Sequence, residues 1–127
     1  MSENVQQTAI AITPDTVLPV LRTLEGTEAG VCVAELVEMI TGEQATAQAE
    51  RHLRHAITEL RMRGHPVCAT PRNGYFWGVT AQEVEATATH LARRSLTGLT
   101  QANRMTGRSI QELTDQLALE LEGGTDG

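Results

Sequence analysis

Residues 46–77 constrain the fold more than any other part of the chain, because a helical pattern runs directly into two short strand-like segments. Four apolar residues recur at helical spacing and predict one buried helix face: Leu53, Ala56, Ile57 and Leu60. Gly64 ends that pattern, and two segments of strand-forming residues follow, one on each side of Asn73-Gly74. The stretch therefore predicts a long helix followed by a small antiparallel hairpin.

The opposite side of this helix is polar, mainly in its N-terminal half. With about 100° per residue, that side carries Gln44, Gln48, Arg51, His55, Thr58 and Met62. Arg51 has no carboxylate four residues away, so it is the strongest candidate for reading a DNA base. The amide of Gln48 can pair with adenine through two hydrogen bonds, which makes Gln48 the second candidate.

Two sequence motifs carry a family resemblance, Leu60-Arg61-Met62-Arg63-Gly64 at the helix end and Gly74-Tyr75 in the hairpin. Together with residues 51–67 they resemble the winged helix-turn-helix domains of bacterial and phage regulators. The DNA-binding head of the biotin-ligase repressor type is the most similar. The resemblance covers about Asp15 to Val79 and implies a recognition helix in the major groove and a wing on the neighbouring backbone. The candidate DNA-binding residues are Gln44, Thr46, Gln48, Arg51, Arg54, His55, Arg72 and Asn73.

Several of these basic residues have a second interpretation. Arg54 and Arg63 each follow a glutamate by four residues, so a solvated ion pair and a DNA contact are equally compatible with the sequence. Arg72 lies in the turn of the hairpin, where it could contact phosphate or simply be a polar turn residue. For the three consecutive aromatic residues 75–77, we expect at least one face of the strand to complete the core.

The charge of the protein is unevenly distributed. The 127 residues carry a formal net charge of −6, which by itself argues against nucleic-acid binding. Residues 1–43 contribute −6 and residues 74–127 contribute −3, whereas residues 44–73 contribute +3. A basic patch on an acidic protein favours sequence-selective binding over general binding of polyanions.

Composition limits the class of protein in other ways. The length suits one small domain with an extension. No apolar run is long enough to span a membrane and no signal peptide opens the sequence, so we expect a cytoplasmic protein. Cys32 and Cys68 both have apolar neighbours and are predicted to be buried thiols, with a disulfide between them or a metal site as the alternative.

The N-terminal half is predicted to contain a flexible tail over residues 1–14 and two short helices. Thr13-Pro14 is one possible start for the first helix, but Pro19 would then lie in the helix interior, so a start at Asp15 or Thr16 is preferred. The second helix is expected at residues 34–40, ending at Gly42. The long helix then begins at Thr46 or, alternatively, at Gln44.

The C-terminal part begins with a capping box, Thr80 to Glu83, which predicts a helix over residues 80–106. Ser109 to Glu112 is a second capping box, and it opens an amphipathic helix within residues 107–127. A domain of this size offers no place to bury the apolar side of that helix. We therefore expect the helix to pack against a second copy of the protein. The predicted dimerisation residues are Ile110, Leu113, Leu117 and Leu121.

The predicted fold class is therefore mainly α with a β-hairpin wing, a winged helix-turn-helix with a C-terminal helical extension. The sequence contains none of the common catalytic or phosphate-binding motifs, so we expect neither an enzyme nor a cofactor or metal site. The favoured function is a small dimeric regulator of phage or mobile-element type that binds double-stranded DNA. The alternative is an adaptor whose winged helix docks another protein in replication or recombination assembly.

Overall fold

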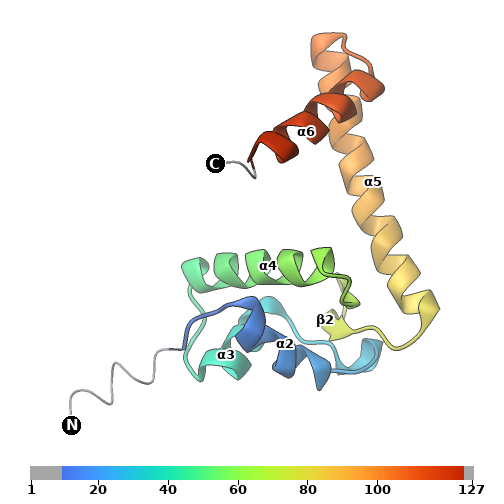
Figure 1. Cartoon of the computed structure of the whole chain (residues 1–127). Helices are drawn as coiled ribbons and strands as arrows, with labels where there is room; N and C mark the ends of the chain where they lie inside the picture. Colours follow the sequence, from blue (N-terminus) through green and yellow to red (C-terminus); the bar gives the residue numbers. More distant parts are fainter. Residues whose placement is uncertain (1–9, 125–127) are drawn as a thin grey trace. The chain divides into compact units, whose positions relative to one another are not determined.

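The computed structural model describes residues 10–124, which are mainly helical and contain one two-stranded antiparallel hairpin, as predicted (Figure 1). The protein divides into two compact units, the first ending at Thr87 and the second beginning at Ala88. We call the described part of the first unit, residues 10–87, the head. In sequence order the elements are α2 (Pro14–Arg22), the 3-10 helix η1 (Thr27–Ala29), α3 (Val33–Thr41), α4 (Ala47–Met62), β1 (Val67–Thr70), β2 (Gly74–Trp77), α5 (Ala81–Thr106) and α6 (Ile110–Gly124).

Helix α2 begins two or three residues earlier than the preferred prediction. Thr13 is its N-cap, with Pro14 as the first helical residue, and the Thr13 and Thr16 side chains each bond the other's backbone N–H in a capping box. Pro19 therefore does lie inside the helix. The missing N–H of Pro19 removes one backbone bond, whereas the capping box and a proline at the first position stabilise the start at Pro14.

The core of the head lies between α2, α3, α4 and the hairpin. The stripe predicted on α4 is buried as expected, and α2 and α3 cover it with apolar side chains of their own. The core residues contributed by α2 and α3 are Val17, Leu21, Leu36, Val37 and Ile40. Gly42 ends α3 in the left-handed conformation, with φ of 76°, as its predicted role requires.

The hairpin pairs Val67 with Trp77 and Thr70 with Gly74. The other edge of β2 is also occupied, because Val31 and Tyr75 exchange two backbone hydrogen bonds of 3.0 and 2.8 Å. Gly74 has φ of 80°, and a Cβ there would collide with the carbonyl of Val31. Only glycine therefore allows β2 to leave the turn and pass so close to the segment before α3.

The three wing aromatics alternate as predicted. Phe76 is buried, whereas Tyr75 and Trp77 are half-buried on the other face. The Trp77 ring lies 5.8 Å from the ring of His65, and the Arg22 guanidinium lies 5.7 Å from the Trp77 ring. The hairpin is therefore packed against the rest of the head on both of its faces.

Glu83 fixes the start of α5 to the head. Its Oε1 accepts hydrogen bonds from the backbone of Val79 and Thr80, completing the predicted capping box with Thr80. Its Oε2 accepts from the backbone and hydroxyl of Thr27, 3.0 and 2.8 Å away. These donors, the Val79 backbone first, lower the pKa of Glu83 to about 2.

In the second unit, α5 continues through Gly98 and ends at Thr106, so Gly98 does not interrupt the helix. Gly107 follows with φ of 78°, and the reciprocal bonds of Ser109 and Glu112 start α6, as predicted. Of the expected dimerisation residues, Leu113 is partly buried, and Ile110, Leu117 and Leu121 are exposed. The apolar stripe of α6 is therefore largely uncovered in the single protomer.

Candidate nucleic-acid interface

Two features of the sequence determine where α4 begins and which of its sides faces outward. Thr46 is the N-cap, and its hydroxyl accepts a 3.1 Å hydrogen bond from the backbone of Ala49. The buried stripe then fixes the rotation of the helix. As a result, the polar side chains Gln48, Arg51, His55 and Thr58 all lie exposed, followed by Met62 at the far end with 82% of its surface accessible. We call these five residues the outer row.

Two predicted contact residues lie outside this helix face. Gln44 is exposed in the segment before α4, because the helix begins at Ala47 and not at the alternative start. Thr46 is exposed, but its hydroxyl is already an acceptor in the helix cap. The exposed side chain of Gln44 can therefore still contact a ligand beside the N-terminus of α4. The side chain of Thr46 instead caps the helix.

The arginines of α4 differ in their environments. Arg54 and Arg63 form the predicted ion pairs, 3.6 Å from Glu50 and 3.8 Å from Glu59. Arg51 makes no ion pair with any side chain in the described part of the protein. Among the outer-row residues, Arg51 is therefore the arginine whose charge is available to a ligand.

Arg61 is not part of the outward surface, although it contributes to the basic charge of residues 44–73. Its Nε donates a 2.8 Å hydrogen bond to the carbonyl of Val67, and the side chain is partly buried. Burial lowers the pKa of Arg61 from its ordinary value. Arg61 thus joins the end of α4 to β1, a role that its sequence position did not reveal.

The tip of the wing presents Arg72. This residue is exposed in the loop between Thr70 and Gly74, whereas its neighbour Asn73 is half-buried. The backbone N–H of Asn73 donates to the Thr70 hydroxyl over 2.9 Å, and its Oδ1 lies 3.3 Å from the same oxygen. Asn73 therefore shapes the loop, and Arg72 is the predicted wing residue left free to reach a partner.

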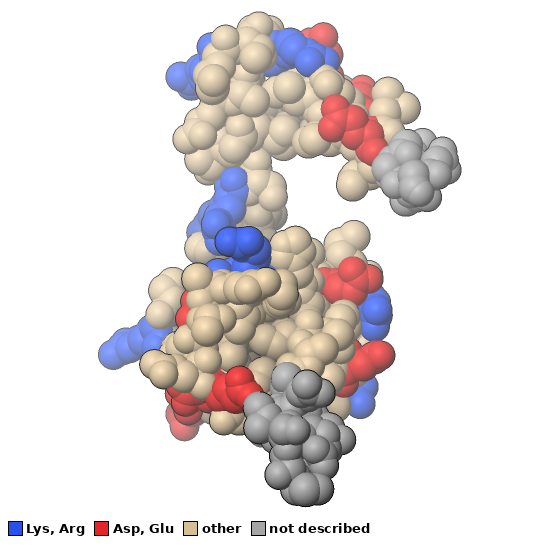
Figure 2. Space-filling model, turned by 90° about the vertical axis from the view of Figure 1, so that its left-hand side faces the viewer, with Lys and Arg blue, Asp and Glu red and all other residues tan. Residues whose placement is uncertain are grey.

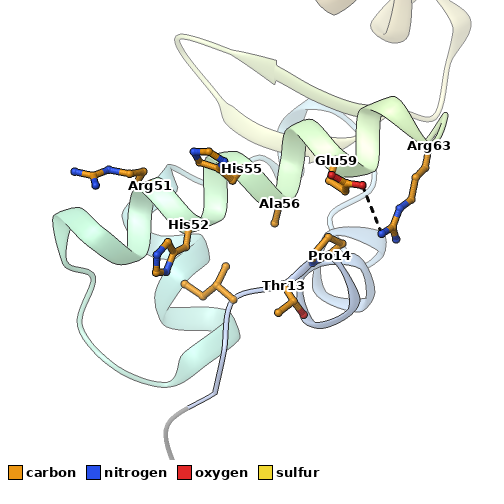
Figure 3. A pocket seen from close by; sticks show the side chains of 9 residues that line it. Thr13, Pro14, Arg51, His52, His55, Ala56, Glu59 and Arg63 are labelled. Atoms are coloured by element: carbon orange, nitrogen blue, oxygen red, sulfur yellow. Dashed lines mark ion pairs between the residues drawn. The ribbon is translucent and has the colours of Figure 1, made fainter. Parts of the chain in front are cut away.

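An open groove of about 640 Å³ runs along the flank of α4 beside the outer row (Figure 3). In Figure 3, His52 points toward the N-terminal segment, Arg51 extends away from the groove, and Arg63 pairs with Glu59. The lining residues are Ile12, Thr13, Pro14, Arg51, His52, His55, Ala56, Glu59 and Arg63. Because Arg51 points away and Arg63 is paired with Glu59, the hydrogen-bonding side chains left in the groove are mainly Thr13, His52 and His55.

The N-terminal segment borders this surface, which the sequence did not suggest. Ile12 is half-buried against the core, and the Ala11 carbonyl accepts a 2.8 Å hydrogen bond from the Thr16 hydroxyl. Residues 10–14 are therefore part of the head; the rest of the predicted tail, residues 1–9, lies outside the described residues. A second groove, of about 340 Å³, contains Ile10 together with Gln44, Gln48 and His52. The apolar residues Ile10 and Ile12 were the available signal for this packing.

One of the two cysteines departs from its prediction. Cys68 is buried in β1, and burial raises the pKa of its thiol. Cys32 is exposed, because it is the N-cap of α3 and lies where the backbone turns at the surface. Within residues 10–124, no group of three or more His, Cys, Asp or Glu side chains could hold a metal ion.

Figure 2 shows acidic and basic side chains next to one another along one edge of the face of the head that it displays. None of the described helices is both long and apolar enough to cross a bilayer. Comparison of the sequence and structure with protein-family models, with curated proteins and with solved structures finds no match. The function is therefore inferred from the surface of α4 and the wing.

Proposed function

We propose that the head is a winged helix-turn-helix that binds double-stranded DNA, with α4 in the major groove and the wing on the neighbouring backbone. The order of elements supports this proposal. Helix α2 is followed by the Val31 bridge to β2, by α3 and α4, and then by the hairpin. This is the order in which winged helices present their third helix to DNA.

The observation that carries the proposal is the position of Arg51. It lies on the exposed row of a helix whose other face is locked in the core, and no carboxylate in the described residues neutralises it. A guanidinium held in this way can donate two hydrogen bonds to O6 and N7 of guanine. Gln48 and His55 lie beside it with further hydrogen-bonding groups.

The wing would supply the second contact. Arg72 is exposed at its tip, and the hydrogen bonds between Thr70 and Asn73 hold the loop in shape. A phosphate contact from Arg72 would set the register of α4 on the duplex without reading sequence. Exposed acids on α2 and α3, such as Asp15, Glu35 and Glu38, would lower the affinity for DNA in other orientations. These properties favour a sequence-selective regulator.

The test compares two substitutions by fluorescence anisotropy, on a duplex selected from a random library and on its scrambled version. Arg51→Ala should lose about 1–3 kcal/mol on the selected duplex and reduce discrimination between the two sequences. Arg72→Ala should weaken both duplexes equally and lower the salt slope by about one unit. Neither should shift the melting temperature, because both side chains are exposed.

Arg63→Ala is the matched control, since it removes an arginine next to the end of α4 whose charge is already paired with Glu59. Its effect on affinity should be smaller than that of Arg51→Ala. Equal losses from all three substitutions would mean that α4 binds as a general cationic surface and does not read bases. If the protein binds no duplex, the adaptor function takes the place of DNA binding.

A further inference from the structure

Basic and acidic residues occupy separate segments of the sequence from residue 86, next to the start of the second unit, to residue 124. Residues 86–111 contain four arginines and no acidic residue, a formal charge of +4, whereas residues 112–124 contain four acids and no basic residue, a formal charge of −4. Figure 2 shows basic side chains along α5 and acidic ones nearer the C-terminal end of the protein. The two helices of this unit are therefore electrostatically complementary.

Among the side chains that the structure describes, these opposite charges form no ion pair with each other. The ion pairs of the described side chains are those of Arg54 with Glu50 and of Arg63 with Glu59, and none joins α5 to α6. Asp115 and Glu120 instead accept hydrogen bonds from Gln111 and Gln116 of their own helix. At about 100° per residue, His90, Arg93, Arg94 and Arg104 fall on one side of α5, opposite the partly buried Leu99 and Asn103.

Both helices also leave apolar surface uncovered. On α6, Leu117 is 51% and Leu121 73% exposed, in line with the predicted dimerisation stripe. On α5, Ala88, Leu91, Ser95 and Gly98 follow a 4-3 spacing and are all exposed, and a Cβ at Gly98 would meet open space. At about 100° per residue, Glu120 borders the leucine stripe of α6 and Arg94 borders the small-residue seam of α5. Such surfaces are the two halves of a helix-packing interface.

We propose that these surfaces join two copies of the protein, with α6 of each copy packed on the α5 seam of the other. Leu117 and Leu121 would lie over the seam between Leu91 and Gly98, and Glu120 would face Arg94. Each protomer carries both surfaces, so a dimer with a twofold axis contains the α5–α6 contact twice and covers both surfaces of each protomer. This inference goes beyond DNA binding and does not depend on it.

The test is a pair of charge-reversed full-length proteins, studied without DNA by sedimentation. The acidic variant carries Arg94→Glu, and the basic variant carries Glu120→Arg. Each alone should self-associate at least about tenfold more weakly than the unmodified protein, because like charges then meet at both halves of the interface. An equimolar mixture of the acidic and basic variants should form the heterodimer, since both of its halves are again complementary.

Two controls change net charge equally but on the head. Arg51→Glu matches the acidic variant, and Glu35→Arg matches the basic variant; both controls should remain dimeric. Circular dichroism of the acidic and basic variants should retain the helix content of the unmodified protein. The inference is overturned if the unmodified protein is monomeric at about 100 μM, a concentration that detects even modest interfaces, or if the acidic and basic variants each remain dimeric. A monomeric protein whose DNA affinity falls in the acidic variant would assign the basic side of α5 to the DNA backbone instead.

Discussion

Ile57→Ala tests whether α4 is anchored in the head as described. Ile57 is 1% exposed and belongs to the core cluster shared by α2, α3 and α4. Truncation to alanine removes three buried carbon atoms, which at about 0.8 kcal/mol each gives roughly 2.4 kcal/mol of lost transfer free energy. The cavity left behind adds to this loss, so we expect the free energy of unfolding to fall by about 3–4 kcal/mol, within the usual range for such changes.

The assay is urea unfolding of the full-length protein, followed by the fluorescence of its single tryptophan, Trp77, which lies in the wing of the head. Met62→Ala is the matched control on the same helix, because Met62 is 82% exposed and its truncation should change stability by less than about 0.5 kcal/mol. If Ile57→Ala also costs less than about 0.5 kcal/mol, the buried face of α4 has been assigned wrongly. The assignment of the outer row to the exposed face of α4 would then be wrong as well.

Two further predictions concern the junctions of the head. Arg61→Ala should lower the free energy of unfolding by about 1–3 kcal/mol in the same urea assay, because it removes the charge-assisted hydrogen bond to the Val67 carbonyl. The control Arg63→Ala should lower it by at most about 0.5 kcal/mol. Equal losses from the two substitutions would contradict the structural role of Arg61. The pKa of Glu83 is depressed to about 2, so the bonds of its carboxylate stabilise the fold fully above its ordinary pKa near 4.5 and are lost as pH falls from there toward 2. Glu83→Gln should therefore lower stability at pH 7 and flatten its dependence on pH over this range, and an unchanged acid unfolding profile would show that the junction contributes nothing.

Periodic and local signals in the sequence predicted much of the head correctly. The stripe containing Leu53 and Ile57, the cap at Thr46 and the stop at Gly42 all depend on residues within a few positions of one another. Such features are encoded locally, so they can be read without knowing the tertiary structure. The alternation of the wing aromatics follows from strand geometry in the same way.

The errors occur where a competing or distant interaction decides the outcome. Helix α2 starts at Pro14 and not at Asp15 or Thr16, because the capping box of Thr13 and Thr16 outweighs the backbone bond that Pro19 removes. In the sequence Arg61 resembles its neighbours, and only the approach of Val67 distinguishes it from a surface arginine. Cys32 has apolar neighbours in the sequence, but the turn into α3 places it at the surface.

The candidate interface was predictable only in part. The spacing of residues 48–58 placed Gln48, Arg51 and His55 on one side of a helix, and the structure exposes all three. The groove beside them could not be predicted, since it depends on the packing of Ile12 next to His52 and Ala56. The roles of Thr46 and Asn73 also needed the structure, which shows their side chains in contacts within the head.

A salt titration of the unmodified protein on duplex DNA tests the central claim most directly. In the proposed complex Arg51 reads a base, so the phosphate contacts come from Arg72, from Arg54 and from the backbone donors at the N-terminus of α4. Roughly two or three such contacts are expected, each of which should contribute about −0.9 to the slope of log K against log salt. We therefore predict a linear decrease with a slope of roughly −2 to −3 between about 50 and 200 mM salt. Absence of DNA binding at the low end of this range, or an affinity that does not change with salt, would contradict the assignment of α4 and the wing to DNA.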